Sequence, residues 1–111
     1  MDVVNLEALS WQGVPDTWKG KVAEGEPGVR YKMFTTGATA APSGQLIEFE
    51  PGHHEAPHSH AESELFYIVS GDLTIGADAI APGMVVHIAG GTVYGPLDTK
   101  AGCRFLRLSL A

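Results

Sequence analysis

Apolar and polar residues alternate along several short stretches of the chain, and glycine or proline separates these stretches. The alternation is regular in "LIEFE", residues 46–50, where Ile47 and Phe49 share one face. It is regular again in "FLRLSL", residues 105–110, where three leucines alternate with Arg107 and Ser109. Because successive side chains of a strand point to opposite faces, this period of two is typical of strands that turn an apolar face to a core.

The turn residues predict where the strands begin and end. We expect strands at about residues 30–36, 44–50, 64–70, 72–76, 84–89 and 103–110, with shorter extended pieces near 54–60 and 93–97. No stretch has the period of a long amphipathic helix. Short strands at regular spacing favour an all-β fold, either a sandwich or a small barrel.

The first 29 residues lack this pattern and predict an irregular arm ahead of a barrel at 30–111. Both tryptophans of the chain, Trp11 and Trp18, lie in this arm, among glycines, Pro15 and several charged residues. Tryptophans in such a setting most simply anchor the arm on the barrel or on a second subunit, although they are also suited to contacting a ligand. Together with the edge strands expected of a sandwich, the arm predicts a homodimer.

Composition limits the range of partners and compartments. With 111 residues, 44% of them hydrophobic, the chain is long enough for one domain with a core of its own. Its net charge of −6 and scattered Lys and Arg argue against binding to nucleic acid or to a membrane surface. The start "MDVVNLEALSW" lacks the features of a signal peptide, and we expect a cytoplasmic protein. The single cysteine, Cys103, is interpreted as a small core residue.

The candidate chemistry is concentrated in "PGHHEAPHSHAESELFYIVSG", residues 51–71. On an extended strand His58 and His60 face the same way, so both imidazoles can meet at one point. Glu64 follows after a short turn and could reach that point if its strand pairs with the histidine strand. Two nitrogens and one oxygen suit Zn, Fe, Mn, Ni or Co better than Ca or Mg. A solvated loop rich in His and Glu is the alternative.

The spacing of this stretch resembles the first motif of the cupin family, Gly-x5-His-x-His-x3-Glu-x6-Gly, and matches it at every fixed position from Gly52 to Gly71. The resemblance implies a jelly-roll barrel, also called a double-stranded β-helix. It further implies an internal metal held by two histidines and a glutamate of the first motif and by a histidine of the second. The chain is similar to small bacterial cupins, including ChrR-like and diketone-cleaving dioxygenase-like ones.

The second cupin motif departs from the family pattern, because Tyr94 stands where its histidine is expected. Three possibilities follow. Tyr94 could bind the metal as a phenolate, which would favour Fe(III). It could stay neutral and donate a hydrogen bond, leaving coordination positions open. Alternatively His87, His53 or His54 could replace the missing ligand. A barrel that has lost its metal and only binds a ligand is the simpler alternative.

The sequence therefore predicts a metal-dependent cupin enzyme, of dioxygenase or isomerase/lyase type, that acts on a small organic molecule. We expect His58, His60, Glu64 and Tyr94 at the metal, which would be Fe, Mn, Ni, Co or Zn. Tyr94 and His87 are the candidate catalytic residues, although the facing of His87 depends on strand register, which a shift of one residue reverses. The competing interpretation is a non-catalytic module that senses a metal or ligand.

Overall fold

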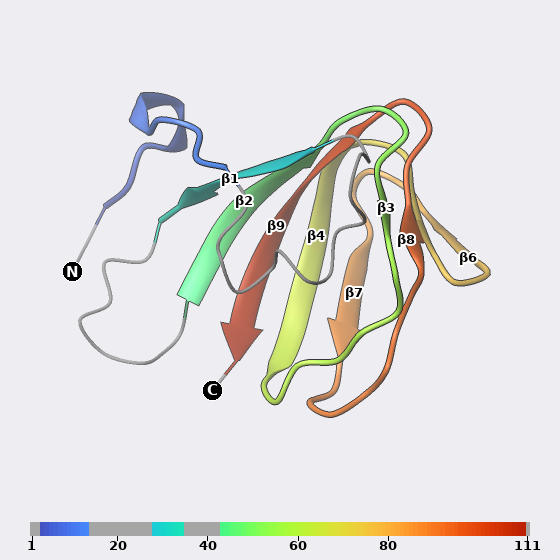
Figure 1. The fold of residues 1–111 in the computed structure, drawn as a ribbon. Coiled ribbons are helices and arrows are strands. Elements are labelled where there is room, and N and C mark those ends of the chain that lie inside the picture. The colour runs from blue at the N-terminus through green and yellow to red at the C-terminus, as the bar shows by residue number, and fades with distance from the viewer. Residues whose placement is uncertain (1–2, 14–27, 35–42, 111) are drawn as a thin grey trace.

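The fold consists of two antiparallel β-sheets that face each other (Figure 1). The computed structural model describes residues 3–13, 28–34 and 43–110. The first sheet has the order β1 (Val29–Met33), β2 (Ser43–Phe49), β9 (Cys103–Leu110), β4 (Ser63–Gly71) and β7 (Val85–Ile88). The second has the order β3 (His54–Glu55), β8 (Leu97–Asp98), β5 (Leu73–Ile75) and β6 (Asp78–Ile80). A short 3-10 helix, η1 (Leu6–Ala8), precedes them.

The strand order confirms the all-β jelly-roll prediction. Strands distant in sequence lie side by side, with β2 next to β9 and β3 next to β8, as long crossing connections of a jelly roll require. The six main strands predicted from the pattern are all present, although residues 35 and 36 of the first lie outside the described part. The pattern missed β6. No helix among the described residues has the length and apolar character needed to cross a membrane.

The core fills the space between the sheets, and β4 shows how its residues alternate. Phe66 and Ile68 face inward and are almost fully buried, whereas Tyr67 and Val69 face outward. Glu64 has the same parity as Phe66 and is therefore carried into the interior. Gly71 ends the strand at φ +85°, where a Cβ atom would lie 2.0 Å from a backbone carbonyl oxygen. Only glycine fits there, which explains the last position of the motif.

The facing of β9 is the reverse of what its alternation predicts. Phe105, Arg107 and Ser109 are buried, whereas Leu108 is 37% exposed on the outer face. The reversal has two physical causes. Phe105, which has the same facing as Arg107 and Ser109, packs against other aromatic rings of the core. Arg107 finds partners for its charge inside, so the usual cost of burying a guanidinium is offset.

The described part of the N-terminal arm packs on the outside of the first sheet. Two cationic groups lie over the Trp11 ring. The Arg30 guanidinium carbon is 4.3 Å from the ring centroid, and Lys32 Nζ is 4.8 Å from it. Lys32 also donates a hydrogen bond to the carbonyl oxygen of Leu6 at 2.7 Å. Trp18 lies outside the described residues. The division into arm and barrel and the homodimer stay predictions.

Candidate active site in the barrel cavity

A cavity opens between the two sheets. Its empty space, open mouth included, is about 370 Å³. Apolar and aromatic side chains form most of its wall, with polar groups gathered in one part. Its lining consists of Ile47, Phe49, Glu55, His58, His60, Phe66, Tyr94, Leu97, Phe105 and Arg107. This mixture is typical of a site for a small organic molecule.

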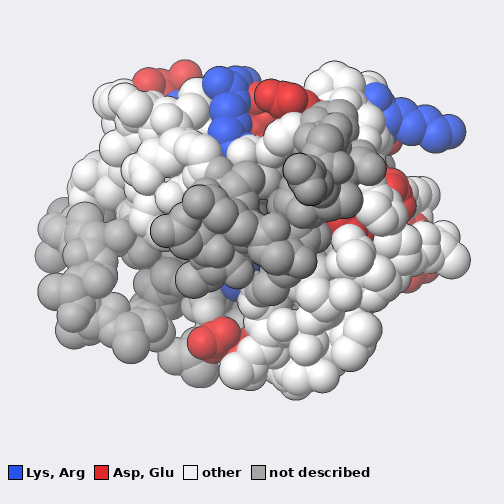
Figure 2. Space-filling model, viewed as in Figure 1, with Lys and Arg blue, Asp and Glu red and all other residues white. Residues whose placement is uncertain are grey.

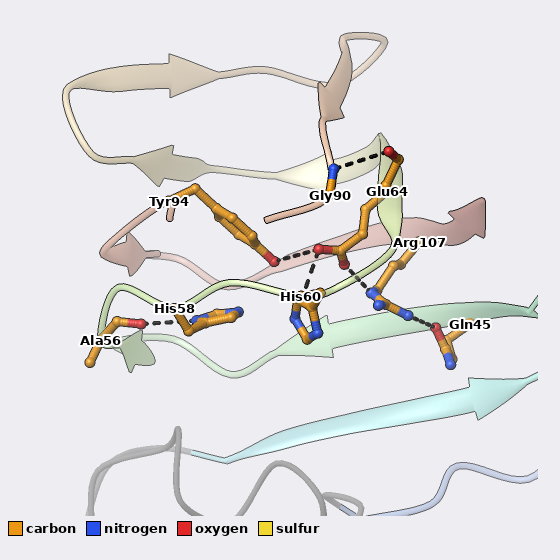
Figure 3. Close-up of polar contacts among 9 residues, drawn as sticks. Gln45, Ala56, His58, His60, Glu64, Gly90, Tyr94 and Arg107 are labelled. Carbon is orange, nitrogen blue, oxygen red and sulfur yellow. Dashed lines mark hydrogen bonds and ion pairs between the residues drawn. The ribbon is translucent and has the colours of Figure 1, made fainter. Parts of the chain in front are cut away.

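Glu64 connects polar side chains of the wall from the first sheet, in which neighbouring strands β4, β9 and β2 carry Glu64, Arg107 and Gln45 (Figure 3). One carboxylate oxygen, Oε2, accepts a hydrogen bond from Arg107 Nε, and the other, Oε1, accepts one from the Tyr94 hydroxyl at 3.1 Å. Arg107 Nη1 in turn donates to Gln45 Oε1 at 3.0 Å. The Glu64 side chain is 1% exposed, and the adjacent guanidinium offsets the free-energy cost of burying the carboxylate.

The two motif histidines reach the cavity from the segment between β3 and β4. His58 and Tyr94 exchange backbone hydrogen bonds of 3.0 and 2.9 Å, so the histidine segment pairs with the Tyr94 segment. The pairing with the Glu64 strand, considered from the sequence, is therefore wrong. The His58 and His60 rings stand edge to face with centroids 5.1 Å apart. His60 Nε2 lies 3.8 Å from Glu64 Oε1.

These residues fit a transition metal in donor type and in direction. Glu64 turns Oε1 toward His60 while Oε2 accepts from Arg107, so one oxygen is directed at the His60 imidazole. His58 Nδ1 contacts the Ala56 carbonyl oxygen at 3.0 Å, which leaves Nε2 as the nitrogen available to a ligand. The described residues contain no group of three donors already close enough to hold an ion. Metal binding therefore requires these side chains to draw together.

Tyr94 lies in the cavity as a hydrogen-bond donor. Burial raises the pKa of the Tyr94 phenol well above its usual value of 10, and the neighbouring Glu64 carboxylate raises it further. A neutral phenol donating to Glu64 corresponds to the second of the three possibilities drawn from the sequence, in which Tyr94 keeps its proton.

The other three histidines do not line the cavity. His87 is exposed on the outer face of β7, opposite Leu65, because its neighbours in the strand take the inward positions. The catalytic role considered for it is not supported by this position. His53 is fully buried against the Phe49 ring, with centroids 4.4 Å apart. His54 is half-buried and paired with Asp98 at 2.5 Å.

Three polar residues at or beside the cavity were not found from the sequence. They are Gln45, Glu55 and Arg107. The alternation of β9 placed Arg107 on the outer face, and no local signal corrects this. Glu55 stands three residues before His58 in the histidine-rich stretch, and this position was its only available signal. Of the apolar residues considered as lining, Phe49 and Phe66 line the cavity, whereas Met84 is 47% exposed.

Comparisons with known proteins establish the fold. No protein-family model matches the chain, and no curated protein matches it. Among solved structures, an acetylacetone dioxygenase from Acinetobacter johnsonii matches with a TM-score of 0.80 and 11% identity, over 99% of this chain and 74% of the other. An RmlC-like cupin from Shewanella frigidimarina matches with a TM-score of 0.66 and 16% identity, over 80% and 81%.

A third match is the structure of Rhodobacter sphaeroides SigE in complex with the anti-sigma ChrR. Its TM-score is 0.71 at 18% identity, and the alignment spans 96% of this chain but only 51% of that one. At these identities the likeness shows the fold alone, and it confirms the jelly-roll fold that the cupin resemblance implied.

Proposed function

Because the chain has the cupin fold, we propose that its cavity is the active site of a metal-dependent enzyme acting on a small organic molecule. The observation that carries this proposal is the orientation of Glu64. Arg107 and Gln45 fix one end of the carboxylate, and the other end points toward His60. A buried carboxylate held in this way resembles a metal ligand oriented by neighbours that do not touch the metal.

In this proposal His58, His60 and Glu64 hold a transition metal ion of the Fe, Mn, Ni, Co or Zn group. Such an ion supplies Lewis-acid polarisation of a carbonyl, or a site for dioxygen. Tyr94 acts as a neutral hydrogen-bond donor at the edge of the site, beside both His58 and Glu64. It is thus a candidate to orient Glu64 or a bound carbonyl oxygen.

The substrate proposed is a small compound with an enolisable carbonyl, transformed by dioxygenase or isomerase/lyase chemistry. The small volume and the aromatic wall of Phe49, Phe66 and Phe105 favour a compact molecule with few charges. The acetylacetone dioxygenase of similar fold makes 2,4-pentanedione a reasonable first test compound. The fold does not decide between catalysis and binding, and the likeness to the ChrR complex keeps a non-catalytic sensing module as the second candidate.

The decisive experiment is a metal analysis of the untagged protein, purified without chelator, by plasma mass spectrometry. We expect close to one equivalent of a transition metal, and its loss in the His58→Ala/His60→Ala double variant. His87→Ala is the matched control, since this histidine is exposed away from the cavity, and it should retain the metal. Absence of metal, with no rebinding on titration, would contradict the proposal and favour a ligand-binding barrel.

Activity is then tested with the metal found. Oxygen consumption with 2,4-pentanedione distinguishes dioxygenase chemistry from the isomerase/lyase alternative. If removing the metal with a chelator changes only a ligand affinity or the oligomeric state, and no turnover is found, the sensing module is the better interpretation.

A further inference from the structure

The cavity contains a second carboxylate, that of Glu55, which the metal proposal does not use. Glu55 is the last residue of β3, where its backbone pairs with Leu97 of β8. It is only 7% exposed, and its side chain lines the same cavity as His58 and His60. It therefore faces any molecule that occupies the cavity.

The surroundings of Glu55 differ from those of Glu64. Among the described residues, the polar group in contact with its carboxylate is His53 Nε2, 3.4 Å from Oε1. No described residue donates a regular hydrogen bond to it, and the cavity wall beside it is largely apolar. Leaving the acceptors of a buried carboxylate without donors is costly, so such groups are found where a ligand or water completes them.

Two carboxylates at one site, with different surroundings, can take different roles: Glu55 lines the cavity, and Glu64 is bound to its lining residues Tyr94 and Arg107. Both oxygens of Glu64 already accept hydrogen bonds, from Arg107 and Tyr94. Among the described residues no donor occupies the acceptor positions of Glu55, and a general base needs a free acceptor within hydrogen-bond reach of the substrate proton.

We propose that Glu55 is the proton acceptor of the cavity, acting on a carbonyl compound with a C–H bond next to the carbonyl group. A Glu55 carboxylate oxygen forms an O–H bond as the substrate C–H bond breaks. The electron pair of that bond forms the carbon–carbon double bond of an enolate, whose negative charge rests on the former carbonyl oxygen. No oxidant or further reactant is needed. The inference rests on the proposed function, and it adds the residue that removes the proton from the substrate.

The experiment follows deuterium incorporation from D2O into 2,4-pentanedione, 2-oxobutanoate and butanone by proton NMR, using the protein with its co-purified metal. We expect the wild type to accelerate exchange of at least one compound above the buffer rate. Glu55→Gln should lower that acceleration about 100-fold, the usual share of a general base. Glu55→Asp keeps the carboxylate but shortens the side chain by one methylene group. It should reduce the acceleration of exchange by less than Glu55→Gln does.

The matched control is Glu62→Gln, a change of the same kind at an exposed glutamate, which should exchange as fast as the wild type. Unchanged exchange in Glu55→Gln overturns the proposal, as does the absence of exchange above buffer in the wild type. Metal content is measured on the same samples. If Glu55→Gln lacks the metal that the wild type holds, Glu55 is a ligand and the proposal is overturned. If the wild type itself holds no metal, it is the proposed function that fails. If Glu55→Gln does not fold, Glu55→Asp gives the decisive comparison: unchanged exchange overturns the proposal.

Discussion

Glu55 lines the cavity and Glu64 is bound to two of its lining residues, and the two buried carboxylates differ in their hydrogen-bond partners. Glu64 comes from the long central strand β4 and is bound at both oxygens by Arg107 and Tyr94. Glu55 comes from the two-residue strand β3 and contacts only His53 Nε2 among the described residues. The comparison teaches that burial alone does not reveal a carboxylate's role. The role is indicated by the number of hydrogen-bond donors that already contact the carboxylate.

The same difference governs stability. The pairing of Glu64 with Arg107 compensates two buried charges, and removing either partner leaves the other without compensation. No Lys or Arg of the described residues pairs with Glu55, so we expect the fold to depend on it much less. Substitutions on the two sides of the cavity should therefore separate folding from function, from the largest effect to the smallest.

The largest effect is expected for Arg107→Met. Methionine keeps much of the side-chain volume but leaves the buried Glu64 charge without its cation, which should cost about 3–5 kcal/mol of unfolding free energy. Urea denaturation followed by circular dichroism measures it. Arg104→Met, on the outer face of the same strand, is the control. Its partner Glu48 is reached at 2.5 Å near the surface, and its loss should cost about 1 kcal/mol or less. If Arg107→Met and Arg104→Met lost the same free energy of unfolding, the buried pair would matter no more than the surface pair, contrary to this prediction.

A double variant sharpens this result. In Glu64→Gln/Arg107→Met neither buried charge remains, so the variant should be more stable than the sum of the two single losses predicts. A coupling energy of at least about 1 kcal/mol in the double-mutant cycle is expected for groups in direct contact. Additive losses would mean that the pair does not interact as the structure indicates.

Tyr94→Phe should have an intermediate effect, because it removes one hydrogen bond to Glu64 and leaves the aromatic ring in place. We expect a loss of about 1 kcal/mol. Because the pKa of Tyr94 is raised in the folded state, its contribution is complete below the unfolded value near 10 and declines as the pH rises above that value. The phenolate absorbance that develops around pH 10 should thus be equal in wild type and variant while both remain folded. A smaller absorbance change in the variant would show that Tyr94 ionises with the others.

Glu55→Gln should have the smallest effect on stability, within about 0.5 kcal/mol of the wild type. Glutamine has nearly the same shape, and no described donor has to be abandoned except the contact with His53. Thermal unfolding of the metal-free protein measures this change without interference from ligand binding. A loss as large as that of Arg107→Met would show that Glu55 maintains the fold rather than serving a ligand.

The sequence by itself determined the strand framework and the motif. Turn residues located the main strands, and the alternation of β2 placed Ile47 and Phe49 correctly in the core. The spacing from Gly52 to Gly71 indicated the cupin fold and brought His58, His60 and Glu64 into consideration. These are local properties, because backbone conformation at a glycine and side-chain parity along one strand depend on neighbouring residues.

Only the tertiary structure decided which face of β9 and β7 turns inward. An alternating strand has two possible facings, and the choice depends on partners far away in the sequence. Arg107 is inside because Glu64 and Gln45, 43 and 62 residues away, receive its hydrogen bonds. His87 is outside because its strand neighbours take the inward positions. Glu55 joined the site for the same reason, since the pairing of β3 with β8 directs it into a cavity that exists only once both sheets have assembled.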